Sequence, residues 1–186
     1  DDGLLITSTN CCNTTYDSFI NKYNFNYDSP FMEWENSYSE SGIYWPTSII
    51  RTEENNEYVM AGYSDGGAIG ILSINLDGSV NWTNQFGEEP GDYSKSLILV
   101  PDGYVISGNK GVNGYNGVYW LLKLDISGNV LYEYLDENNL DGEAADAVFI
   151  YNSFGQPVVS VGTVGDRSST NGYWIDPCGR IVARGY

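Results

Sequence analysis

The chain has 186 residues, of which 41% are hydrophobic and 15% aromatic, a composition that excludes a disordered polymer. Eight Lys and Arg residues against 25 Asp and Glu residues give a formal net charge of −17, which disfavours nucleic acid and anionic membranes as partners. Histidine is absent, so catalytic triads that use His and zinc sites built on His are excluded.

No stretch approaches the ~18 apolar residues of a membrane-spanning helix, so no membrane span is predicted. The sequence begins with Asp1 rather than Met, and we expect a processed product or part of a longer protein. A composition poor in Lys and rich in Asn, Tyr and Gly favours an extracellular or cell-surface location.

Residues 1–38 contain three short segments that are expected to be strands. The segments are DDGLLITS (1–8), SFINKYNFN (18–26) and FMEWENSY (31–38). The first of these resembles PDGYVISG (101–108), which is the second strand of a later unit. The opening unit is therefore predicted to lack the innermost strand that the later units have.

Three four-stranded units follow, at about 39–87, 88–137 and 138–186. Their first strands are expected at 47–52, 95–100 and 146–151, and their second strands at 58–62, 104–108 and 158–162. The third and fourth strands flank a turn that ends in Gly78, Gly128 or Gly179, so the repeat spacing is 50 and then 51 residues. Short strands repeated at this spacing are typical of a propeller.

The sequence thus predicts an all-β fold: one domain over 1–186, a β-propeller of about four blades with an incomplete first blade. Closure comes either from the four blades themselves or from another chain or missing sequence. The segments Pro101–Gly108, Tyr119–Asp125 and Gly128–Tyr132 resemble β-propeller repeats of secreted bacterial proteins of the kelch-like and quinoprotein-like type. That resemblance implies the fold, and it implies no function or cofactor site.

Asp77, Asp125 and Asp176 precede the three turns in register, and a turn role explains them, because Asp accepts hydrogen bonds from backbone N–H groups two residues on. Aromatic residues of the fourth strands are expected to pack between neighbouring units; they are Trp34, Trp82 and Tyr132. Trp120 and Trp174, on the third strands, are expected in the core of a unit or between units.

An acidic stretch contains a weak candidate for a calcium loop. Its oxygen-bearing residues are Glu137, Asn139, Asp141 and Glu143, with Gly142 at the sixth position. Glu stands where the first Asp belongs, and Val148 occupies the twelfth position, where a bidentate Glu is needed. The preferred interpretation is a solvated connection between units, so no metal or other cofactor is predicted.

Exposed aromatic side chains could contact a sugar or a protein partner. Tyr44 and Trp45 are adjacent in an expected loop before the first complete unit, and Tyr115 and Tyr119 belong to the same candidate surface. Packing over the mouth of a central channel is the alternative interpretation for the first pair.

Three cysteines and two Asn-x-Ser/Thr sequences suggest modifications of an extracellular protein. Cys11 and Cys12 are expected in a loop on one face and Cys178 in a turn on the other. Free thiols, a bridge between the adjacent pair, and a disulfide between subunits all remain open. Asn13 and Asn81 are the candidate glycosylation sites.

Three functions follow, in order of preference. The first is a secreted or cell-surface structural subunit that self-associates, with a filament as one outcome, because the inner strand is missing and catalytic residue types are scarce. The second is a propeller module that binds carbohydrate or protein. The third is a glycan-active enzyme that uses two carboxylates. We expect the chain not to be an enzyme.

Overall fold

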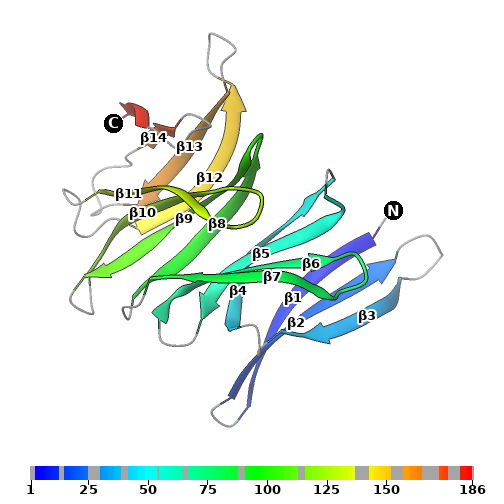
Figure 1. Cartoon of the computed structure of the whole chain (residues 1–186). Helices are drawn as coiled ribbons and strands as arrows, with labels where there is room; N and C mark the ends of the chain where they lie inside the picture. The colour runs from blue at the N-terminus through cyan, green and yellow to red at the C-terminus, as the bar shows by residue number, and fades with distance from the viewer. Residues whose placement is uncertain are drawn as a thin grey trace.

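The computed structural model shows an all-β protein (Figure 1). It describes residues 3–12, 15–24, 30–38, 42–53, 55–64, 67–87, 91–112, 116–136, 143–151, 157–164, 172–175 and 181–185. Side chains are described up to residue 135, except at 10–12, 15–16, 112 and 116. Within the described residues no helix is long and apolar enough to cross a membrane.

The strands form one three-stranded and three four-stranded antiparallel sheets, in chain order. The first sheet holds β1 (Gly3–Cys12), β2 (Thr15–Asn24) and β3 (Phe31–Ser37). The second holds β4 (Ile43–Thr52), β5 (Glu57–Ser64), β6 (Ile69–Asn75) and β7 (Val80–Phe86). The predicted four-stranded unit, and the three-stranded unit at the start, are confirmed.

The third and fourth sheets repeat this order. The third holds β8 (Tyr93–Val100), β9 (Gly103–Val112), β10 (Asn116–Leu124) and β11 (Val130–Asp136). The fourth holds β12 (Glu143–Tyr151), β13 (Pro157–Val164), β14 (Gly172–Ile175) and β15 (Ile181–Gly185). Sequential strands of each sheet pair antiparallel, as the alternating strands and turn residues predicted.

Two segments expected in loops are strands instead. Tyr44 and Trp45 lie in β4, which begins at Ile43, and the backbone of Cys11 and Cys12 ends β1. β4 accommodates Pro46 between two register shifts, at Ile43/Trp45 and Pro46/Ser48. A proline at a bulge of an edge strand removes no ladder hydrogen bond that the sheet needs.

The four sheets follow one another in a curved, open array, with the two chain termini at opposite ends (Figure 1). Consecutive sheets contact each other through their first strands, β4 with β8 and β8 with β12, while β1 and β2 contact β4. A ring closed by the four sheets themselves, one of the two alternatives from sequence, is therefore not formed among the described strands.

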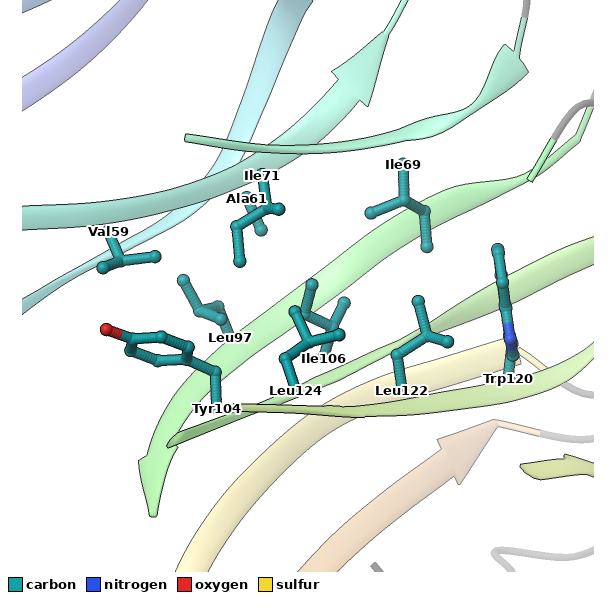
Figure 2. Packing of buried hydrophobic residues seen from close by; sticks show 10 residues of the cluster. All are labelled: Val59, Ala61, Ile69, Ile71, Leu97, Tyr104, Ile106, Trp120, Leu122 and Leu124. Carbon is teal, nitrogen blue, oxygen red and sulfur yellow. The ribbon is translucent and has the colours of Figure 1, made fainter. Parts of the chain in front are cut away.

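Each sheet has two faces. The forward face is the one on the side of the next sheet along the chain, and the rear face is the opposite one, which in the later sheets lies toward the preceding sheet. The forward face of the second sheet carries Val59 and Ile71, which pack against Ile106 and Leu122 on the rear face of the third (Figure 2). Its own rear face, with Met60 and Leu72 among others, packs against the first sheet. Side chains alternate between these faces because successive residues of a strand point to opposite sides.

Tryptophans reinforce both interfaces, as predicted. Trp34 packs on the cluster between the first two sheets, and Trp82 and Trp120 belong to the cluster between the second and third. Trp120 is fully buried, whereas Tyr132 on β11 is exposed. Trp174 lies in β14, where only the backbone is described.

Candidate interaction site on the first sheet

The rear face of the first sheet is uncovered by any described element. Leu4 and Ile6 are 46% and 43% exposed on β1, and Met32 on β3 is 50% exposed. Leu4 pairs with Tyr23, which in turn pairs with Met32, so these three side chains form one row across the sheet. This set, with Ile6, is called the uncovered rear face below.

The equivalent positions in the next two sheets are buried. The repeat aligns Leu4 with Tyr58 and Tyr104, which are 6% and 0% exposed. The same alignment matches Ile6 with Met60 and Ile106, which are 0% and 1% exposed. A contiguous apolar patch in a position that the same fold covers elsewhere is a candidate surface for association.

The inner edge of β1 is a second open feature of this sheet. In the other three sheets, the equivalent strands β5, β9 and β13 each pair on that side with β4, β8 and β12. No described strand pairs with β1 there, because the first sheet has the order β1-β2-β3. Unpaired N–H and C=O groups along such an edge form a template for another strand.

A cavity of about 230 Å³ lies beside this edge. Its lining combines Gly3, Leu4 and Leu5 of β1 with Ile49, Ile50 and Arg51 of β4. Lys22 also lines it and forms an ion pair with Glu33, with Nζ 2.8 Å from a carboxylate oxygen. Hydrogen bonds from Lys22 and then from Asn24 lower the pKa of the Glu33 carboxyl.

A larger crevice of about 520 Å³ occupies the corresponding place between the second and third sheets. One wall is the end of β4 with the turn that follows it, including Arg51 and Thr52. The other wall includes Leu99, Pro101 and Tyr104. In the cavity beside the first sheet the wall that corresponds to β4 is missing, because the first sheet has no described inner strand.

Glu57 is a buried carboxylate that the sequence analysis missed. It accepts hydrogen bonds from Tyr104 Oη at 3.0 Å, Asn81 Nδ2 at 3.0 Å, Asn55 Nδ2 at 3.2 Å and the Ser73 hydroxyl. Burial, and next the hydrogen bond to Glu57, raise the pKa of Tyr104 above its ordinary range. Only Tyr104 among these donors comes from the third sheet, so its hydrogen bond to Glu57 joins the two sheets.

A lysine inside a sheet interface is another feature that sequence reasoning passed over. The side chain of Lys123 on β10 is 1% exposed, and its Nζ lies 2.7 Å from Oδ1 of Asp102. The repeat places Lys22 of β2 at the same position, and Ser73 in the second sheet. A charged residue in the middle of an apolar strand was the available signal for this pattern.

The turn role predicted for the aspartates is confirmed where they are described. Asp77 Oδ1 accepts a hydrogen bond from the backbone N–H of Ser79 at 2.9 Å, and Asp125 Oδ1 from that of Ser127 at 2.9 Å. The turn glycines Gly78 and Gly128 have φ of 85° and 78°. Asp176 and Gly179 lie outside the described residues.

The candidate contact aromatics are placed very differently. Trp45 is 43% exposed and lies beside Tyr63, with ring centroids 6.2 Å apart and a 53° tilt. Tyr44 is half-buried, and its carbonyl accepts a hydrogen bond from Thr9 Oγ1 at 3.2 Å. Tyr119 is fully buried and offers no contact surface, which corrects that expectation, and Tyr115 lies outside the described residues.

Several other candidates fall partly or wholly outside the described residues. Asn13, Cys178, Glu137, Asn139 and Asp141 are among them, and the side chains of Cys11, Cys12 and Glu143 are not described. Among the side chains that are described, no cluster of acidic or Cys residues could hold a metal ion. Asn81 Nδ2, the nitrogen that would carry a glycan, donates a hydrogen bond to Glu57 at 3.0 Å.

No family model matches the chain, and no curated protein is significantly similar to it.

Proposed function

We propose that this chain is a structural subunit, secreted or at the cell surface, that self-associates through its first sheet. In this proposal the sheets are propeller-type blades, and the open array is completed or extended by further copies. The observation that carries it is the uncovered rear face, where Leu4 and Ile6 are exposed although their repeat equivalents are buried.

The interfaces inside the chain supply the model for contact between copies. Forward face packs on rear face twice, in the two hydrophobic clusters between the first three sheets. A contact between unlike faces is heterologous, so it generates a ring if the rotation closes and a fibre if it does not. The uncovered rear face is thus the receiving half of such a contact.

The net charge of −17 opposes this association at low ionic strength. Salt screens the repulsion over a Debye length of about 8 Å at physiological ionic strength. We therefore expect association to strengthen as salt rises, which is opposite to the behaviour of an assembly held by charge complementarity.

Sedimentation velocity over a range of protein and salt concentrations tests the proposal. The double variant Leu4→Lys/Ile6→Lys is expected to remain monomeric where the unaltered chain grows in mass. A matched control, Val80→Lys/Leu131→Lys, changes two residues that are exposed on outer strands, and is expected to associate normally. A chain that stays monomeric throughout, or a Leu4/Ile6 variant that assembles normally, overturns the proposal.

Carbohydrate or protein binding at Trp45 is the second candidate function. Its exposed indole and the adjacent Tyr63 ring form an aromatic surface at one end of the second sheet. Aromatic rings of this kind stack on sugar rings and partner side chains. Glycan-array binding that Trp45→Ala removes supports this function, and binding that survives the substitution assigns it elsewhere.

A further inference from the structure

We propose that the inner edge of β1 accepts an added β-strand from a polypeptide partner whose sequence pattern matches the inner strands of this chain. This acceptor edge is separate from the uncovered rear face, so the inference does not depend on self-association. The partner is an extended segment with small or polar residues followed by consecutive aliphatic ones.

The edge itself is built to pair. β1 runs through ten consecutive pairs with β2 and has no bulge. Its sequence, GLLITSTNCC, contains no proline and no charged residue. Proteins protect exposed edges with charges, prolines or bulges, and β1 has none of these along its length.

The outer edges of the first and third sheets differ from β1 in this respect. β3 carries Glu33 and Glu35, and its pairing with β2 is broken by a register shift. β11 carries Glu133 and Asp136, and its pairing with β10 is shifted in the same way. β1 lacks the acidic residues and the register shifts of these two outer strands, and this difference supports its role as an edge that accepts a partner strand.

The space beside β1 matches the inner strand of the other sheets. There, β4, β8 and β12 pair antiparallel with the next strand and contact one another in sequence. A strand added to β1 would extend this row by one and contact β4. The cavity of about 230 Å³ between β1 and β4 offers aliphatic walls, from Leu5, Ile49 and Ile50, for its side chains.

The inner strands of this chain define the side chains that such a strand would carry. Their sequences are TSIIRT (47–52), KSLILV (95–100) and DAVFIY (146–151). β4 shows which residues of an inner strand face the next sheet: Ile50 packs on the cluster between the second and third sheets, and Thr47 Oγ1 lies 2.8 Å from Ser94 Oγ. The partner strand should therefore place a small residue and an aliphatic residue against β4, with main-chain hydrogen bonds to β1 supplying affinity.

A synthetic peptide with the sequence YSKSLILV, residues 93–100, is the probe. Its binding is measured by fluorescence anisotropy at protein concentrations where sedimentation shows a monomer, and hydrogen exchange then locates it. We expect protection of β1 amides and no change in β3 or β11. A scrambled peptide of the same composition is the control. Failure to bind, or protection of the outer strands instead, overturns the proposal.

Two further peptides distinguish strand addition from side-chain docking. Each peptide carries N-methyl groups on alternate residues. In one peptide the methyl groups block the N–H groups of one edge of the strand, and in the other peptide they block those of the opposite edge. Loss of about three main-chain hydrogen bonds predicts at least a tenfold weakening for one peptide and little change for the other. Equal binding of the two methylated peptides contradicts an added strand.

Discussion

The side-chain amide of Asn84 donates a hydrogen bond to the carbonyl oxygen of Gly128, 3.0 Å away, and so ties β7 of the second sheet to a turn of the third. The same contact occurs one unit earlier, where Asn36 Nδ2 donates to the carbonyl of Gly78 at 3.3 Å. Tyr38 Oη also donates to that carbonyl, at 2.7 Å. The turn between the third and fourth strands of a sheet therefore docks on the outer strand of the sheet before it.

Gly128→Ala is expected to lower the free energy of unfolding by about 2–3 kcal/mol. An added Cβ would lie 2.5 Å from the Trp82 ring, and the φ of 78° disfavours any L side chain. Chemical denaturation monitored by tryptophan fluorescence measures the change. Asn84→Ala, which removes the hydrogen bond without adding bulk, should cost only about 1 kcal/mol. Equal costs for the two variants would contradict this account.

Glu57→Gln tests whether the buried carboxylate holds the second and third sheets together. The amide supplies one oxygen in place of two and turns its N–H donors either toward Tyr104 and Asn55 or toward Ser73 and Asn81, so we expect a loss of about 1–3 kcal/mol in denaturant titrations. Glu53→Gln, at an exposed residue that follows β4, serves as the control and should change stability by less than about 0.5 kcal/mol.

The Lys123–Asp102 pair should respond asymmetrically to the removal of either partner. The lysine is buried and the aspartate is half exposed, so Asp102→Ala leaves a charge in the interface without its carboxylate and should cost about 1–3 kcal/mol. Lys123→Met removes that charge and leaves Asp102 solvated. We expect the free energy of unfolding of this variant to lie within about 1 kcal/mol of that of the unaltered chain, or above it. A larger loss for Lys123→Met than for Asp102→Ala would reverse the interpretation.

Asp125 should contribute to the acid limb of the stability curve. Hydrogen bonds from the side chain and the backbone of Asn129 lower its pKa in the folded state. A lowered pKa stabilises the fold above the pKa of the unfolded chain, and this contribution disappears as pH falls through the folded value. The difference in melting temperature between Asp125→Asn and the unaltered chain, measured between pH 7 and 3, should therefore shrink as the pH falls. A constant difference across that range would exclude this origin.

The strand order of each sheet was predictable because it depends on local signals. Alternating apolar residues define the strands, and an Asp followed by a Gly with positive φ, as at Asp125 and Gly128, defines the hairpin. The missing inner strand of the first sheet was predictable by the same comparison between units.

The arrangement of the sheets and the candidate site were less accessible. Leu4 and Ile6 look like core residues in the sequence, and only the placement of neighbouring sheets shows that they are exposed. Glu57 meets Tyr104 across 47 residues of sequence, so no local pattern indicates their contact. Trp45 was assigned to a loop because it lies before the first strand expected from the repeat, whereas β4 begins at Ile43 and includes it.

The neighbour-to-neighbour packing of the sheets has a consequence for how the protein unfolds. The principal contacts between described elements of different sheets join consecutive sheets. Stability in such arrays is approximately a sum of the stability of each unit and of each junction, rather than one property of the whole. The end units, with a single junction each, should open first, and slow amide exchange should concentrate in the second and third sheets.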